Sequence, residues 1–291
     1  MSVLLQELEE LVGGLAVEVG PKVVGIGRFG SGIVIADRTI LTNAHVVRRE
    51  QVQVRFADGR TAAGTVTGLD ADGDLAVISA DTEGIVPLEW ADAAPSIGAA
   101  VVAMANPGGR GLRATLGFVS STARGFRGPR GRRRDSLEHT APLPRGSSGS
   151  PVVDRQGRLL GINTIRLEGG LIAAIAITPK LREHIQALAR GESPSRATLG
   201  LALAPPGVAR RLQRAVGLPE RDGLLVRGVA EDGPAAHAGV EQGDLIVGVD
   251  GSAITGVDDL YEQLDRRSSG GTLELELVRG TDERKVEVTL G

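Results

Sequence analysis

Three polar residues of the chain carry side chains that could act together in nucleophilic chemistry. They are His45, Asp74 and Ser148, and each adjoins an apolar run that is typical of a buried strand. A serine hydroxyl is a weak nucleophile until a base takes its proton, and an imidazole base needs an acid that holds its orientation. Taken singly, the three could be a structural histidine, a turn aspartate (as Asp70 and Asp72 could be) and part of a flexible Gly/Ser loop. Together they predict a Ser-His-Asp site.

The elements that must position these residues are mostly short strands. Between residues 23 and 177, apolar runs alternate with turn signals such as Asp58-Gly59 and Gln156-Gly157, a pattern that favours a barrel or a sandwich. A helix is expected from Thr178-Pro179 to about Arg190. A linker-like stretch follows, and the remaining chain mixes strands with two helices, near 207–216 and 257–266, in a small α+β module.

The first residues form an amphipathic helical pattern. Leucines recur every three or four positions, with glutamates facing away. The stripe consists of Leu4, Leu8, Leu11 and Leu15. Two interpretations stay open: the helix packs on its own domain, or it contacts another subunit.

Composition narrows the class of protein. The chain has 291 residues, which suggests two domains, and it has no cysteine, which excludes a disulfide framework, a thiol nucleophile and a Cys-ligated metal site. The net charge of −3 supplies no general field for nucleic acid. Aromatic residues make up only 2% of the chain, so aliphatic side chains must build the cores. No apolar stretch is long enough to span a membrane, and no signal peptide is recognised. The expected location is therefore cytoplasmic. If the start site is wrong, the expected location is periplasmic or extracellular.

The motifs around the three residues resemble those of the HtrA (Deg) family of serine proteases. The motifs are Gly30-Ser31-Gly32, Thr42-Asn43-Ala44-His45-Val46-Val47, Asp74-Leu75-Ala76-Val77, Asn106-Pro107, Leu116-Gly117-Phe118-Val119-Ser120, Gly146-Ser147-Ser148-Gly149-Ser150 and Leu160-Gly161-Ile162-Asn163-Thr164. The resemblance implies a mainly β fold, with a chymotrypsin-like double β-barrel followed by a small α+β PDZ domain. It implies a helical segment over 1–20, a protease domain over 21–190, a linker over 191–197 and a PDZ domain over 198–291.

By this resemblance, His45 is the general base and then the general acid, Asp74 holds its tautomer, and Ser148 attacks the scissile carbonyl. The backbone N–H groups of Gly146 and Ser148, helped by Ser147, form the oxyanion hole. The implied activity is ATP-independent endoproteolysis of unfolded or damaged proteins, with no cofactor and no metal. A homotrimer is also implied. The alternative is a catalytically weak or inactive peptide-binding adaptor on the same scaffold.

Two departures from the family pattern concern the loop that carries Ser148. Ser147 stands where the family usually has Asn, and Ser150 stands where it usually has Gly, which would strain the backbone if position 150 needs a positive φ. The segment before the loop also differs, since Pro142 and Pro144 each fix φ and remove a hydrogen-bond donor. These prolines could hold the loop in an active or in an inactive form.

The resemblance also places a specificity pocket six residues before the nucleophile, at the uncharged Pro142. Small aliphatic side chains are therefore expected before the cleaved bond. The expected pocket residues are Pro142, Leu143, Ile162, Asn163 and Thr164.

The C-terminal module looks like a bacterial PDZ domain because it contains Thr198-Leu199-Gly200-Leu201 and Gly243-Asp244-Leu245-Ile246. Such domains add an extended peptide to a sheet edge and capture its carboxylate on backbone N–H groups. The residues expected to bind C-terminal peptides are Leu199, Gly200, Leu201, Leu260 and Leu264. His237 is expected at the surface.

An arginine-rich segment over 124–134 has three interpretations. It could be a solvated surface loop, a sensor loop that reports on the PDZ domain, or a site for polyanions, although only Phe126 could stack on a base. No specific nucleic-acid partner is expected.

Overall fold

The computed structural model describes residues 3–122, 135–192, 197–204, 206–215, 217, 220–267 and 269–291. The chain divides into two compact units between residues 194 and 195. The arginine-rich segment 124–134 and residues 193–196 of the expected linker lie outside the described residues.

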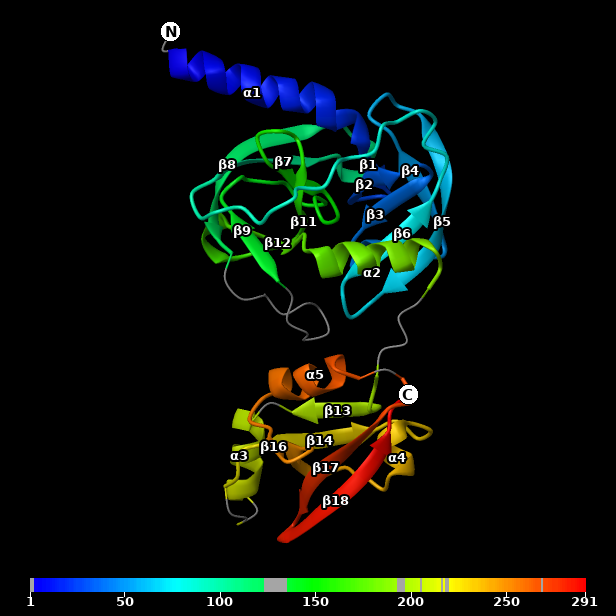
Figure 1. The fold of residues 1–291 in the computed structure, drawn as a ribbon, viewed down its shortest axis with the longest axis vertical. Coiled ribbons are helices and arrows are strands. Elements are labelled where there is room, and N and C mark those ends of the chain that lie inside the picture. Colours follow the sequence, from blue (N-terminus) through cyan, green and yellow to red (C-terminus); the bar gives the residue numbers. More distant parts are fainter. Residues whose placement is uncertain are drawn as a thin grey trace. The chain divides into compact units, whose positions relative to one another are not determined.

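The first unit contains two closed antiparallel barrels of six strands each (Figure 1). The first barrel has the order β1 (Val23–Ile26), β2 (Gly30–Ala36), β3 (Thr39–Thr42), β6 (Leu75–Ser79), β5 (Thr61–Asp70) and β4 (Gln51–Arg55). The second has the order β10 (Pro151–Val153), β11 (Leu159–Arg166), β12 (Ile172–Ala176), β9 (Ser136–His139), β8 (Arg113–Ser121) and β7 (Ala100–Ala105). This arrangement confirms the predicted chymotrypsin-like double barrel.

Aliphatic side chains fill both barrels and the space between them. Phe56 is the one aromatic residue among the buried hydrophobic side chains of the described part of the chain. One cluster joins Leu41 and Val77 of the first barrel to Met104 and Ile162 of the second. Burial of aliphatic side chains contributes about 1.5–3 kcal/mol each, so this shared cluster fixes the two barrels against one another.

Two helices pack on the barrels. The helix α1 (Val3–Val19) lies within the expected helical segment 1–20, and only its second half packs: Leu15 and Val19 are buried, whereas Leu4 is 61% exposed. The helix α2 (Pro179–Ala189) begins as predicted, with the Thr178 hydroxyl accepting the Leu181 N–H, and it packs on β5 and β6. Short 3₁₀ turns are η1 (Gly20–Lys22), η2 (Ala44–Val46), η3 (Pro107–Gly109) and η4 (Glu168–Gly170).

The second unit is a small sheet with helices. Its strands run in the order β13 (Leu201–Ala204), β14 (Leu224–Val229), β15 (Leu245–Val249), β17 (Thr272–Arg279) and β18 (Asp282–Thr289), with β16 (Ser252–Ala253) paired to β15. Its helices are α3 (Pro206–Ala215), α4 (Pro234–His237) and α5 (Val257–Asp265). Among the described residues of this unit, β13 pairs with β14 alone, so β13 is an edge strand.

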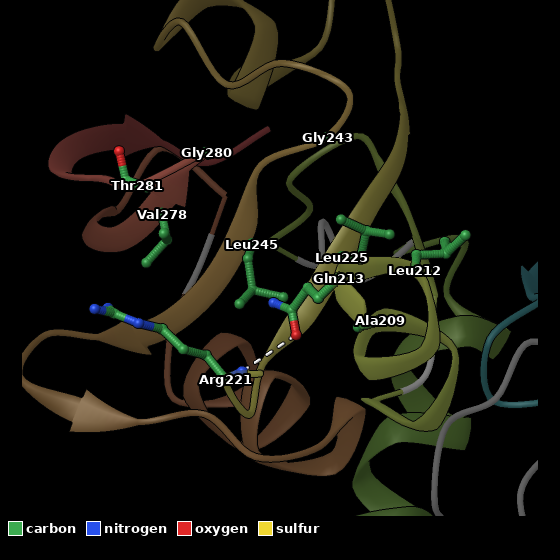
Figure 2. A pocket seen from close by; sticks show the side chains of 10 residues that line it. All are labelled: Ala209, Leu212, Gln213, Arg221, Leu225, Gly243, Leu245, Val278, Gly280 and Thr281. Atoms are coloured by element: carbon green, nitrogen blue, oxygen red, sulfur yellow. Dashed lines mark hydrogen bonds between the residues drawn. The ribbon is translucent and has the colours of Figure 1, made fainter. Parts of the chain in front are cut away.

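Alternation along these strands sends side chains to both faces of the sheet. Val226 and Ile246 enter the main core, while Leu225 and Leu245 face α3. A hollow of 220 Å³ lies on that second face, and Figure 2 shows Gln213 at its wall, accepting the Arg221 N–H at 3.1 Å.

Within the described residues, no helix is both long and apolar enough to cross a membrane.

Candidate active site

His45 and Asp74 are brought together by strand pairing in the first barrel. His45 lies in η2, directly after β3, and Asp74 lies in the turn between β5 and β6. Since Thr42 of β3 pairs with Ala76 of β6, the two segments leave the barrel side by side. The Nδ1 atom of His45 is 2.8 Å from each Asp74 carboxylate oxygen, and the His45 backbone N–H donates to Oδ1 at 3.0 Å.

The Asp74 carboxylate is buried and held from several sides. Its side chain is 3% exposed, while that of His45 is 38% exposed. The Thr164 hydroxyl of β11 donates to Oδ2 at 2.8 Å, and the Asn43 amide donates to the Asp74 carbonyl at 2.9 Å. Asp74 also adopts φ +53°, a left-handed conformation that costs a non-glycine residue energy and recurs at functional sites. The arrangement holds His45 with Nδ1 toward the acid, which leaves Nε2 to accept a proton.

Ser148 lies in the loop between β9 and β10. Its hydroxyl donates to the Thr164 carbonyl at 3.1 Å, and Ser148 and His45 line one cavity. The backbone N–H groups of Gly146, Ser147 and Ser148 donate to none of the described residues. Free donors of this kind at a nucleophile can stabilise a developing oxyanion.

The loop around Ser148 is pressed against β2 and β3, and two glycines make this possible. Gly146 (φ +89°) and Gly149 (φ +86°) are left-handed, and a Cβ on Gly149 would lie 2.2 Å from the Thr42 Oγ1. The Ser31 hydroxyl donates to the Gly146 carbonyl at 3.0 Å, and the Ser31 N–H donates to the Ser148 carbonyl at 3.1 Å. These contacts fix the loop from the first barrel.

Ser150 is not strained at the position where the family usually has glycine. Its backbone is not among those with a positive φ in the described part of the chain, and its side chain is fully buried. The Asn163 amide donates to the Ser150 hydroxyl at 3.1 Å and to the Pro151 carbonyl at 3.0 Å. Serine therefore takes part in a hydrogen-bonded network here.

The network continues to the buried His139 of β9. Because the Asn163 amide nitrogen donates to Ser150 and Pro151, its Oδ1 must accept, and His139 Nε2 lies 2.8 Å from it. His139 Nε2 thus carries the proton, and its buried Nδ1 has no partner among the described residues. Burial lowers the pKa of His139, because the cation would lose its hydration, and the hydrogen bond to Asn163 offsets this only in part.

Beside the nucleophile, a second cavity of 320 Å³ contains most of the expected specificity-pocket residues. Leu143, Asn163 and Thr164 line it, together with Ile165, Arg166 and Ile172, which the sequence reasoning missed. Pro142 is exposed and Ile162 is buried in the core, and neither lines this cavity. The Arg166 guanidinium donates to the Leu143 carbonyl.

The expected peptide-binding residues of the second unit lie along β13 and α5. Gly200 (φ +72°) and Leu201 are half-buried at the edge strand, and the Gly200 carbonyl accepts the Ala230 N–H at 2.9 Å. Leu199, Leu260 and Leu264 are 4%, 2% and 8% exposed and belong to the core cluster that Leu201 packs against.

The buried carboxylate of Asp244 accepts hydrogen bonds from two residues of the same unit, from Arg279 Nε at 2.7 Å and from the Glu241 N–H at 2.9 Å.

Several contacts of the site were not predicted from the sequence. Ser31 and Asn43 lie within recognised motifs, yet only the structure assigns them partners in the Ser148 and Asp74 segments. Thr164 was expected as a pocket residue, and it also bonds Asp74. Among the described residues, no cluster of His, Asp and Glu could hold a metal ion.

Comparisons with known proteins agree with this geometry. Residues 30–162 match the trypsin-like peptidase domain family, and residues 207–290 match the PDZ domain family. "Putative serine protease HhoA" of Synechocystis sp. is 32% identical over 292 residues, which cover 95% of this chain and 73% of that protein. The chain belongs to the HtrA/Deg family of serine proteases.

Two further proteins give the extent of the similarity. "Probable periplasmic serine endoprotease DegP-like" of Halomonas elongata is 31% identical over 270 residues, which cover 90% of this chain and 56% of that protein. The chain thus spans little more than half the length of that relative. The crystal structure of the serine endoprotease from Yersinia pestis aligns with a TM-score of 0.72 and 28% identity, covering 96% of this chain and 97% of that one.

Proposed function

We propose that the chain hydrolyses peptide bonds within unfolded or damaged polypeptides, using Ser148 as nucleophile, His45 as base and Asp74 as the residue that orients His45. The observation that carries this proposal is the buried Asp74 carboxylate, which lies 2.8 Å from Nδ1 of a half-exposed His45 that shares a cavity with Ser148. Neither ATP nor a metal is needed, because protein groups supply the base, the nucleophile and the oxyanion donors.

The chemistry begins with a movement of the Ser148 side chain. Its hydroxyl now donates to the Thr164 carbonyl, so a χ1 rotation must turn it toward His45 Nε2. As the Ser148 Oγ bonds to the scissile carbonyl carbon, its proton passes to His45, and the carbonyl oxygen takes the negative charge beside the N–H groups of Gly146, Ser147 and Ser148. His45 then protonates the leaving amine, and water hydrolyses the acyl-enzyme.

The cavity beside Leu143 supports a preference for small or medium aliphatic side chains before the cleaved bond. Its wall is apolar at Leu143, Ile165 and Ile172, and its charged members are the cations Arg145 and Arg166. Lysine or arginine before the bond would meet like charge there, so a trypsin-like preference is disfavoured.

The edge strand β13 supports recognition of peptide C-termini. An extended peptide can add to its free edge, with its carboxylate on the N–H groups near Gly200 and its last side chain against Leu201. The side chains of Leu199, Leu260 and Leu264 are buried. A small shift of α5 would expose them as an apolar pocket for the last side chain of the peptide. The homotrimer and the cytoplasmic location stay predictions.

One observation favours the alternative of an inactive peptide-binding adaptor. The Ser148 hydroxyl is engaged by Thr164, and no hydrogen bond to His45 is found among the described residues. Labelling with a fluorophosphonate probe, beside casein cleavage, decides between the two. The proposal predicts labelling and cleavage by the natural chain and neither by Ser148→Ala, since loss of the nucleophile costs about 10⁶ in turnover in a related site. No labelling of a folded chain that still binds C-terminal peptides would establish the adaptor.

A further inference from the structure

The cavity that contains His45 and Ser148 is lined by arginines. It has a volume of 550 Å³, and Arg28, Arg48 and Arg49 contribute to its wall from two separate segments, the β1–β2 turn and the stretch after η2. The remaining members include apolar surface from Phe29 and Val46. An extended peptide lying here would meet both an apolar floor and three guanidinium groups.

A neighbouring hollow extends the same charge. It has a volume of 340 Å³, shares Arg28 with the first cavity, and adds Arg55 and Arg110. Arg55 Nη1 donates to the carbonyls of Gly27 at 2.8 Å and Gly108 at 3.0 Å, so its guanidinium is fixed in place. The guanidinium groups of Arg28 and Arg110 lie 5.1 and 5.2 Å from the centre of the Phe29 ring.

Within the part of the chain that the structure describes, no acidic side chain forms an ion pair with these arginines. No Asp or Glu occurs among the residues that line the two hollows. Arg48 and Arg49 form no hydrogen bond or ion pair with any other described residue. Elsewhere on the surface arginines do pair, as Arg60 does with Asp58 at 2.7 Å. A concave surface lined by one sign of charge focuses its field on the groups that enter it, even in a chain whose net charge is −3.

Ser148 and Gly146 line both this cavity and the smaller cavity beside Leu143. A polypeptide that crosses the nucleophile therefore has the residue before the scissile bond in the smaller cavity and the residues after it among the arginines. We propose that this cavity selects substrates with acidic side chains in the first positions after the cleaved bond. This inference rests on the proposed function and specifies its substrate class.

A binding measurement tests the inference without depending on turnover. The full chain carrying Ser148→Ala is titrated with two labelled peptides that share Val-Ala before the cleavage position and carry Glu-Glu or Gln-Gln after it. Both peptides end in an amide, because a free carboxylate would bind the PDZ domain. Exposed ion pairs contribute up to about 1 kcal/mol, or about fivefold, each. With two glutamates, the acidic peptide should therefore bind about fivefold more tightly at low salt, within an upper limit of about 25-fold.

The preference should disappear under two conditions. At about 1 M NaCl, where the screening length is about 3 Å, the ratio of the two affinities should fall toward one. Adding Arg48→Gln and Arg49→Gln should reduce the low-salt ratio to about twofold or less. The matched control is Arg113→Gln, which removes an exposed arginine of β8 that lines neither cavity and should keep the full ratio.

Three outcomes overturn the inference: equal affinities of the two peptides at low salt, an affinity ratio unchanged by Arg48→Gln and Arg49→Gln, or tight binding of polyphosphate with no gain for the acidic peptide. The last would assign the cavity to a polyanion. Cleavage of the same peptides by the natural chain tests the proposed function separately. If the acidic peptide binds more tightly but neither peptide is cleaved, the proposed hydrolysis is refuted and the proposed binding preference stands.

Discussion

The hydrogen bond from Thr164 to Asp74 offers a sharp test of how the site is held. Thr164→Val removes the hydroxyl that donates to Oδ2 at 2.8 Å, keeps the β-branched shape, and keeps the backbone carbonyl that accepts from Ser148. Asp74 would retain two donors, the N–H and Nδ1 of His45. The acid would therefore remain paired but would be free to rotate.

The size of the effect follows from the kind of bond. A hydrogen bond to a charged group contributes about 1.5–3 kcal/mol. The lower figure applies because Oδ2 keeps a contact with His45, and about 1.5 kcal/mol corresponds to about a tenfold fall in rate. The loss should appear mainly in kcat, because Asp74 is buried and touches no substrate. Thr164 itself lines the cavity beside Leu143, but valine keeps the shape of its side chain there, so KM should change little.

The assay is steady-state cleavage of a fluorogenic peptide by the natural chain and by Thr164→Val. Thr115→Val is the matched control, since the Thr115 hydroxyl lies 3.4 Å from the Ala103 carbonyl, away from the site. It should change kcat less than twofold. A kcat for Thr164→Val within twofold of the natural chain, or a loss confined to KM, would refute the reasoning.

Three further perturbations test other contacts of the chain. Gly149→Ala should abolish activity and lower the melting temperature, because the new Cβ would lie 2.2 Å from Thr42 Oγ1; normal activity in the purified variant would contradict this. Burial lowers the pKa of His139 in the folded protein below its value near 6.5 in the unfolded chain. The stability that comes from keeping His139 neutral is therefore complete above pH 6.5 and is lost as the pH falls through the lower, folded pKa. His139→Gln should flatten urea stability against pH in that window, and an unchanged slope would exclude His139 as the cause. Burial raises the pKa of Asp244, but the bonds from Arg279 and a backbone N–H outweigh this and lower it overall, so its stability is present above the unfolded pKa and lost as pH falls through the folded one. Asp244→Asn should lower the free energy of unfolding by about 1.5–3 kcal/mol at pH 7, measured by calorimetry, because Arg279 loses its charged partner there but keeps its bonds to Glu241 and the Gly239 carbonyl.

Local patterns in the sequence predicted much of the fold, for identifiable reasons. The helices α2, α3 and α5 and the longer strands follow from residue periodicity and from proline or glycine at their ends. The His45, Asp74 and Ser148 motifs were recognised because their neighbours are unusual in type and order. The expected double barrel and PDZ domain are confirmed, since short segments of this kind have few ways to bury their apolar faces.

Other features could be read only from the tertiary structure. Helix α1 continues to Val19 through two glycines because Leu15 and Val19 find a core that lies far along the chain. The four-residue strand β13 is ordered by its pairing with β14, which lies more than twenty residues further along the chain and is not visible in local sequence patterns.

The same holds within the candidate site. Thr164 and Asp74 are 90 residues apart, and Ser31 and Gly146 are 115 apart. A hydrogen bond depends on atomic positions to within a few tenths of an ångström, and sequence spacing carries no such information across barrels. The residue types at the site were therefore determined by the sequence alone. Their partners, the unstrained backbone at Ser150 and the arginine lining of the cavity were decided by the packing of the two barrels.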